Sequence, residues 1–159
     1  MTDGVAVEPG DINLREWQRE ALDRWTEVGR SAVVEAVTGT GKTTLGIAAA
    51  ASALSRGLSV LVVVPGVDLL DQWYRAITGV LPRSRVGRRG AGFSDNFQTS
   101  DILVTTVQSA IQKKAPMPTE PALLVADEVH RYGALTFSQL LLPIFTERLG
   151  LTATFERTD

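Results

Sequence analysis

The chain has 159 residues and a formal net charge of −2, and 44% of its residues are hydrophobic and 21% charged. This is ordinary for one soluble globular domain. The absence of cysteine excludes a disulfide framework and a cysteine-based metal site. The acidic balance excludes a uniformly basic nucleic-acid binder, although a local basic surface remains compatible with it. Since no apolar run is long enough to cross a membrane and the first ten residues lack a basic segment, we expect a cytoplasmic protein without a membrane partner.

Helical and strand patterns alternate in the first half of the chain. Residues 1–12 indicate a flexible polar arm, and Asn13 followed by Glu16 resembles the capping box of a helix over 14–28. Four further elements are expected, namely a strand over 32–37, a helix over 42–55, a strand over 58–64 and a helix over 67–79. The segment 80–100 is rich in Gly, Arg and Ser and predicts a loop, with room for one short strand near Val86.

The alternation continues in the second half and indicates the fold class. The expected elements are a strand over 102–105, a short helix over 106–113, a strand over 122–126, a helix over 136–142 and a strand over 148–152. Such a pattern favours an α/β three-layer sandwich, in which helices cover both faces of a mostly parallel sheet. Ligands bind beyond the carboxyl ends of such strands. Five polar features follow strands and would therefore gather at one edge: Thr38–Thr43, Pro65, Thr106, Asp127-Glu128 and Thr152–Thr154.

The stretch from Ala36 to Thr43 lies between an apolar strand pattern and a helix pattern. Its glycines, followed by Lys42 and Thr43, predict a phosphate-binding loop of the Walker A type. Lys42 would reach the β- and γ-phosphates and the Thr43 hydroxyl would hold Mg²⁺, so ATP and Mg²⁺ are the expected cofactors. The first glycine of the pattern is Ala36 here. The alternative is a plain glycine-rich turn between a strand and a helix.

A pair of carboxylates follows the apolar strand pattern over 122–126. Asp127 stands where a Walker B carboxylate would hold Mg²⁺, and Glu128 would polarise the attacking water as a general base. The expected catalytic residues are therefore Lys42, Asp127 and Glu128. The alternative is two solvated acids that end a strand. His130 is the only histidine, and spacing alone assigns it no role.

Six segments in order resemble the motifs of superfamily 2 DExH-box helicases. They are Leu14–Gln18 (Q motif), Ala36–Thr43 (motif I), Pro65–Trp73 (motif Ia), Thr105–Ala110 (motif Ib), Asp127–His130 (DExH box) and Leu151–Thr154 (motif III). The nearest branch contains the XPB-like and type III restriction-like helicases. The resemblance implies that residues 13–159 form the first RecA-like P-loop NTPase domain of a helicase or translocase. It also implies a second RecA-like domain of the same protein, which this chain lacks.

The resemblance assigns roles that spacing alone does not. In the Q motif it implies nucleotide contacts for Arg15 and Gln18, with the Gln18 amide reading adenine; without it, Gln18 would be an ordinary helix-surface glutamine. The remaining implied nucleotide-binding residues are Thr38, Gly39, Thr40, Gly41, Lys42, Thr43 and Thr44. Coupling between nucleotide state and nucleic-acid binding is implied for His130, Thr152 and Thr154, with the last strand between the phosphate-loop strand and the Asp127 strand. Phe155 replaces a frequent proline of the family, which leaves the path of the chain after it open.

A basic stretch points to nucleic acid. Between Gln72 and Ser94 there is no acidic residue, and five arginines are interleaved with glycines. This predicts backbone phosphate contacts around Arg88, Arg89 and Gly90, and the alternative is a solvated basic loop. The resemblance adds contacts from Pro65, Gly66, Thr106 and Gln108.

DNA is the expected partner of the chain, and the motifs leave RNA open. An isolated, monomeric domain of this kind should bind Mg·ATP, hydrolyse it poorly and unwind nothing. The alternatives are another P-loop NTPase or kinase, and a non-catalytic nucleotide-gated module that binds nucleic acid.

Overall fold

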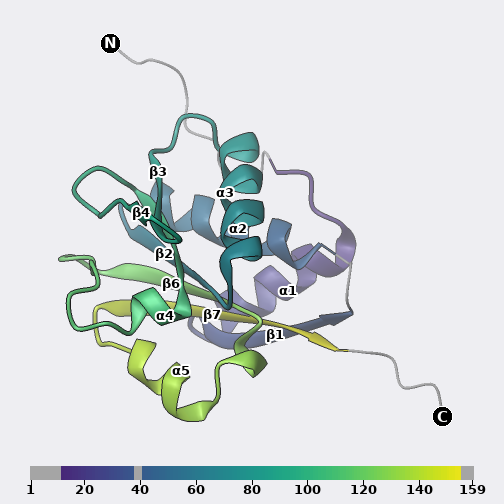
Figure 1. Cartoon of the computed structure of the whole chain (residues 1–159). Helices are drawn as coiled ribbons and strands as arrows, with labels where there is room; N and C mark the ends of the chain where they lie inside the picture. Colours follow the sequence, from purple (N-terminus) through teal and green to yellow (C-terminus); the bar gives the residue numbers. More distant parts are fainter. Residues whose placement is uncertain (1–11, 38–40, 155–159) are drawn as a thin grey trace.

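The computed structural model describes residues 12–37 and 41–154, which form a sheet with helices on both faces (Figure 1). The sheet has seven strands in the order β1-β7-β6-β2-β5-β3-β4, and all neighbours pair in parallel except β3 and β4. The predicted α/β three-layer sandwich with a mostly parallel sheet is therefore confirmed. The strands are β1 (Ser31–Val37), β2 (Ser59–Val64), β3 (Val86–Gly90), β4 (Phe93–Ser94), β5 (Ile102–Thr106), β6 (Ala122–Asp127) and β7 (Phe145–Thr154). The helices are α1 (Glu16–Glu27), α2 (Lys42–Ser55), α3 (Val67–Val80), α4 (Val107–Ala110), the 3₁₀-helix η2 (Val129–Arg131) and α5 (Ala134–Leu140).

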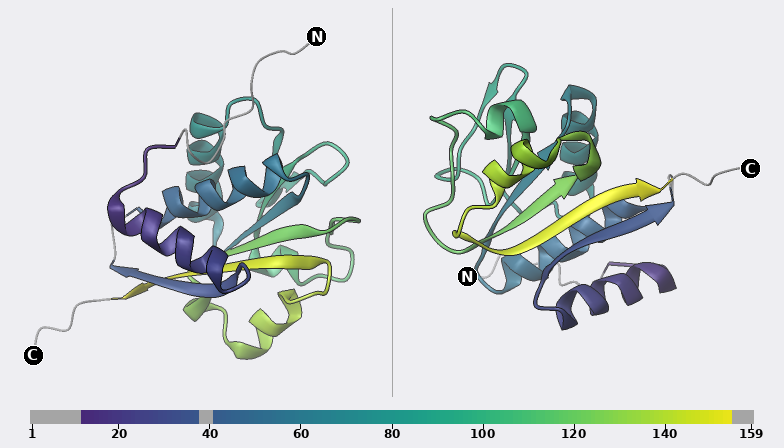
Figure 2. Two further views of the ribbon diagram at one scale, coloured as in Figure 1. Left: turned by 180° about the vertical axis from the view of Figure 1, so that it is seen from behind. Right: turned by 90° about the horizontal axis from the view of Figure 1, so that it is seen from below.

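The central strands are apolar on both faces because both faces are covered. In β2, Val60 and Val62 pack into the cluster that contains α1, α2 and α3. Leu61 and Val63 point the other way, into the cluster that contains α4 and α5. In the left view of Figure 2, α1 and α2 lie on one side of β1 and β7, and α5 lies on the other. Continuous apolar runs are what strands buried on both faces require.

The order of the strands places the expected site residues beside one another. As the resemblance implied, β7 lies between β1 and β6. Thr152 in β7 is paired with Glu35 in β1, and Leu151 is paired with Asp127 in β6. The last strand therefore carries Thr152 to the end of β6.

The start of α1 differs from the prediction. The helix begins at Glu16 with Arg15 as its N-cap, so the capping box expected from Asn13 and Glu16 is wrong. The reason is that the Gln18 side chain reaches back and accepts a hydrogen bond from the Arg15 backbone N–H at 2.7 Å. Ile12, expected at the end of the arm, is buried against the α1–α3 core; the rest of that arm lies outside the described residues.

The short strand expected near Val86 is present as β3, and the segment 80–100 also holds a second strand, β4, where a loop was expected. Strands β3 and β4 form a hairpin joined by Ala91 and Gly92, whose φ angles are +53° and +91°. Two positive φ angles in a two-residue turn are typical of hairpins, because they match the twist of the strands. Arg and Gly dominate this sequence and conceal the alternation by which a strand is normally predicted.

The boundaries of the other elements shift by a few residues. Helix α4 is limited to Val107–Ala110, α5 begins at Ala134, and β7 extends over Phe145–Thr154. Within residues 12–37 and 41–154, none of the helices has the length and apolar character that crossing a membrane requires.

Candidate functional site

Three side chains meet where α2 begins and β6 ends. Lys42 Nζ donates a hydrogen bond to Asp127 Oδ1 at 2.7 Å and forms an ion pair with Glu128. The Asp127 side chain is only 1% exposed. Partial burial acts to lower the pKa of Lys42, but the hydrogen bonds and charges of both carboxylates outweigh it, so this pKa is raised. The structure thus joins the three residues expected to be catalytic, and Lys42 stays positively charged.

Two aromatic residues, Trp73 and Tyr132, also form hydrogen bonds with Asp127. Trp73 Nε1 in α3 donates a hydrogen bond to Asp127 Oδ2 at 2.8 Å. The Tyr132 hydroxyl lies 2.6 Å from the backbone oxygen of Asp127 and 2.8 Å from that of Val63, so its single proton is shared between two acceptors. Burial, together with the charges of Asp127 and Glu128, raises the pKa of Tyr132, which therefore remains a donor.

Sequence reasoning missed both aromatic contacts. The helical periodicity places Trp73 on the core face of its helix, and no motif gives Tyr132 a role. For Trp73 the available signal was the indole N–H of a residue expected on the core face, since such groups usually find a partner.

Glu128 and His130 connect this cluster to β7. Glu128 adopts a left-handed backbone conformation (φ +54°, ψ +46°), which is unusual for a residue with a side chain and marks a sharp turn after β6. His130 Nδ1 lies 2.7 Å from Thr152 Oγ1, and His130 Nε2 lies 3.4 Å from Glu128 Oε2. The structure therefore brings together the expected coupling residues His130 and Thr152. Thr154 ends β7 and is paired with Val37, but its side chain lies outside the described part of the chain.

Gln18 packs against Gly41, the residue before α2. Its side chain is buried, and Nε2 donates to the backbone oxygen of Gly41 at 2.8 Å while Oε1 accepts from Arg15. Gln18 is therefore not a helix-surface glutamine. Arg15 itself is exposed at the start of α1.

Gly41, which precedes α2, has a backbone conformation and a close neighbour that favour glycine. Its φ is +89°, and a Cβ atom there would lie 2.6 Å from Gln18 Nε2. Lys42, Thr43 and Thr44 form the first turn of α2. The expected loop residues Thr38, Gly39 and Thr40 lie outside the described residues.

The oxygen donors at this end of the sheet fit Mg²⁺. Asp127 offers a carboxylate and Thr43 lies in the first turn of α2, next to Lys42. Mg²⁺ in nucleotide sites takes one or two protein ligands and completes its shell with phosphates and water. Within residues 12–37 and 41–154, no group of three or more His, Cys, Asp or Glu is arranged to hold a metal ion.

The residues expected to contact nucleic acid lie further along the same edge. Pro65 and Gly66 follow β2, and Thr106 ends β5. The Thr106 side chain caps α4 by accepting from the Ser109 backbone N–H at 3.3 Å. Gly90 at the end of β3 packs so closely that a Cβ atom would lie 2.9 Å from Thr106 Oγ1. Gln108 is exposed on α4.

The two hairpin arginines have different surroundings. The Arg88 guanidinium lies between the rings of Tyr74 and Phe93, 3.9 Å and 3.8 Å from their centroids, and 3.9 Å from Asp71. Arg89 Nη1 donates a hydrogen bond to the backbone oxygen of Ser94 at 3.2 Å. The Arg88 side chain is therefore held by contacts with Tyr74, Phe93 and Asp71, whereas the Arg89 side chain is held through the backbone of Ser94.

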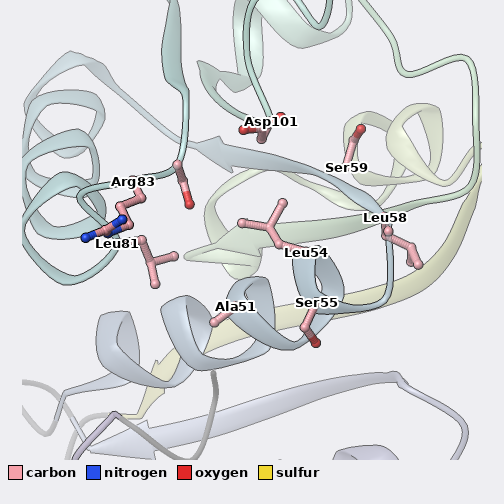
Figure 3. A pocket seen from close by; sticks show the side chains of 10 residues that line it. Ala51, Leu54, Ser55, Leu58, Ser59, Leu81, Arg83 and Asp101 are labelled. Atoms are coloured by element: carbon pink, nitrogen blue, oxygen red, sulfur yellow. The ribbon is translucent and has the colours of Figure 1, made fainter. Parts of the chain in front are cut away.

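A cavity of about 360 Å³ lies at the opposite end of the sheet (Figure 3). It is bordered by Ser59, where β2 begins, and by Asp101, which precedes β5. Because these residues mark the amino ends of parallel strands, the cavity is separate from the Lys42–Asp127 cluster.

The sequence matches a known family and two curated relatives. Residues 11–157 match the family described as type III restriction enzyme, res subunit. The chain is 34% identical over 150 residues to the DNA 3'-5' translocase XPB2 of Sulfurisphaera tokodaii. The matched region covers 93% of this chain and 32% of the relative. It is 29% identical over 156 residues to the DNA 3'-5' helicase XPB of Mycobacterium tuberculosis, covering 92% of this chain and 27% of the relative. The chain thus spans about a third or less of the length of these relatives.

Two solved structures share the fold. The SWI2/SNF2 ATPase core of Sulfolobus solfataricus, solved in complex with dsDNA, superimposes with a TM-score of 0.77 at 22% identity and covers 95% of this chain and 34% of that one. The UvsW helicase of bacteriophage T4 gives a TM-score of 0.72 at 18% identity, covering 88% of this chain and 52% of that one. At these identities the likeness is one of fold, shared with an ATPase core and a helicase.

Proposed function

The chain belongs to the family of the type III restriction enzyme res subunit, and we propose that it is the ATP-binding motor domain of an ATP-dependent DNA helicase or translocase. The observation that carries this proposal is the contact of Lys42 with Asp127 and Glu128 at the carboxyl end of the sheet. The names of both curated relatives, a DNA translocase and a DNA helicase, support DNA as the partner.

Lys42 is held by carboxylates that a nucleotide would displace. When ATP binds, its β- and γ-phosphates offer the ammonium a stronger set of negative oxygens, and the ammonium moves from Asp127 onto them. The proposed phosphate cradle comprises Thr38, Gly39, Thr40, Gly41, Lys42, Thr43 and Thr44. Asp127 and the Thr43 hydroxyl would hold Mg²⁺, which supplies charge neutralisation between the phosphates.

Gln18 keeps enough hydrogen-bonding capacity to read adenine. A side-chain amide has two N–H groups and two lone pairs on its oxygen, and the contacts with Gly41 and Arg15 use one of each. The remaining N–H and lone pair match N7 and the amino group of adenine. We therefore assign Gln18 to the base, with the exposed Arg15 beside it.

Glu128 is proposed as the general base that takes a proton from the attacking water. Its carboxylate lies at the surface of the cluster, between Lys42 and His130. The His130–Thr152 contact then links the reacting end of the nucleotide to β7. A change at the γ-phosphate would be transmitted along this path, with Thr154 further along the strand.

The DNA backbone would lie over the neighbouring strand ends. We assign this surface to Pro65, Gly66, Arg88, Arg89, Gly90, Thr106 and Gln108. The polypeptide beyond this domain would contribute a second RecA-like domain, whose arginine fingers complete the ATP site. An arginine finger raises turnover by about 10³ to 10⁵, so the isolated domain should bind Mg·ATP and turn it over very slowly.

Replacing Glu128 with Gln tests the binding of Mg·ATP and its hydrolysis separately. The variant should bind Mg·ATP within about threefold of the parent, because the amide keeps the shape of the side chain. Hydrolysis over a long single-turnover incubation should fall by about 10² to 10⁴, the usual contribution of a general base.

The matched control is Glu120→Gln, which alters an exposed glutamate in the turn before β6. It should leave binding and turnover unchanged. If Glu128→Gln hydrolyses ATP at the parent's rate, the assignment of the base is wrong. If the parent domain binds no nucleotide at all, the proposed function itself fails.

A further inference from the structure

The indole of Trp73 reaches from α3 through the core to the carboxylate at the end of β6. Trp73 is 1% exposed, and its Nε1 donates to Asp127 Oδ2 at 2.8 Å. The other oxygen, Oδ1, faces Lys42 at 2.7 Å. The two oxygens of Asp127 therefore have different partners, a neutral ring in the core and a charged side chain at the site.

Helix α2 leaves a space for this ring. A Cβ atom at Gly46 would lie 2.6 Å from Trp73 Cη2 and 3.3 Å from Leu151 Cδ1. Glycine within a helix is less favourable than alanine. Gly46 lies about one turn after Lys42 in α2, and a side chain there would force the Trp73 indole to shift.

We infer that Trp73 is a positioning residue that fixes the Asp127 carboxylate so that Oδ1 stays aimed into the nucleotide site. Lys42 cannot do this throughout the cycle, because in the proposed function, on which this inference rests, its ammonium moves onto the phosphates. The indole N–H is a donor only and carries no charge. It therefore holds Oδ2 in both states while Oδ1 is released to a cation.

Trp25 distinguishes this role from the ordinary satisfaction of a buried indole. Its Nε1 donates to the backbone oxygen of Arg148 at 2.9 Å, and the residue is 2% exposed. Each of these two buried tryptophans thus loses one indole hydrogen bond when replaced by Phe. Only Trp73 bonds to a side chain expected to hold Mg²⁺.

The test compares nucleotide affinity with and without the metal in Trp73→Phe and Trp25→Phe. Affinity for a fluorescent ADP analogue is measured in Mg²⁺ and again in EDTA. Loss of a partner that orients a metal ligand typically weakens metal binding by about 10- to 100-fold. In Trp73→Phe the stimulation of binding by Mg²⁺ should therefore fall at least about tenfold, with affinity in EDTA unchanged. Trp25→Phe should keep the parent's ratio.

A second variant preserves the shape of the ring in case Trp73→Phe does not fold. The chain has three tryptophans, so a Trp17→Phe/Trp25→Phe background allows benzothienylalanine to replace Trp73 alone. This residue has sulfur in place of the N–H and should reproduce the loss of Mg²⁺ stimulation.

Equal Mg²⁺ stimulation in the parent and in either position-73 variant would overturn the inference. A parent whose nucleotide binding ignores Mg²⁺ would instead count against the proposed function, so the two failures are distinguishable.

Discussion

Single residues at the start of α2 are fixed by close contacts between distant parts of the chain. Gln18 of α1 bonds to the backbone oxygen of Gly41, and a Cβ atom at Gly41 would lie 2.6 Å from the Gln18 Nε2, so the amide would have to shift. Glycine is thus favoured at position 41 for two reasons, the positive φ angle and the closeness of the Gln18 amide. The sequence pattern alone explains only the first requirement.

Replacing Gly41 with Ala tests this double requirement. An alanine at φ +89° is strained, and its Cβ would also displace the Gln18 amide, leaving buried polar groups without partners. We expect the free energy of unfolding in urea to fall by about 2 to 4 kcal/mol. Nucleotide affinity should fall with it.

Gly57→Ala supplies the control. Gly57 has a similar φ of +83°, but no atom lies within 4 Å of the position that a Cβ would take there. Its substitution should cost about 1 to 2 kcal/mol from strain alone. Equal losses for the two variants would show that Gln18 adds nothing at Gly41.

The sequence predicted well which residues lie together in the candidate site. It predicted less well the contacts that hold them in place. Lys42, Asp127 and Glu128 could be assigned because each follows a strand in a recognisable local pattern. The contact between Trp73 and Asp127 joins residues 54 positions apart. No local pattern encodes which buried ring will lie against which carboxylate, since this depends on how α2 and α3 pack.

Among the elements, the β3–β4 hairpin departs most from expectation. Its arginines looked equivalent in the sequence, but Arg88 is stacked between Tyr74 and Phe93, whereas Arg89 donates through Nη1 to the backbone oxygen of Ser94. Pairing with β5 gives the segment its strand geometry, and that pairing is non-local.

Leucine substitutions should distinguish the contributions of Arg88 and Arg89 to DNA binding and to stability. Arg89→Leu should weaken DNA binding, reduce the slope of log affinity against log salt by about 1, and leave stability unchanged. Arg88→Leu should in addition lower the free energy of unfolding by about 1 to 2 kcal/mol, because two cation–π contacts are lost. Salt-dependent fluorescence anisotropy and urea unfolding measure the two effects. An Arg89→Leu domain that binds DNA as tightly as the parent would remove Arg89 from the proposed surface.

At the scale of the whole molecule, the strand order divides one sheet edge between the two proposed groups of site residues. The ends of β1, β7 and β6 carry the proposed nucleotide residues, and the ends of β2, β5 and β3 carry the proposed DNA residues. Since β6 and β2 are neighbours, Asp127 lies one strand away from the segment that begins at Pro65. The alternation of strands and helices predicted this edge, because parallel strands place all their carboxyl ends together.

The central claim is that this edge binds Mg·ATP through Lys42, and equilibrium binding of Mg·ATP to Lys42→Ala tests it most directly. Lys42 remains charged because its pKa is raised, and a charged hydrogen bond contributes about 1.5 to 3 kcal/mol. We predict affinity at least about tenfold below the parent's, with circular dichroism showing that the variant is folded, and no change for the exposed Lys114→Ala. A folded Lys42→Ala domain that binds Mg·ATP as tightly as the parent would contradict the account.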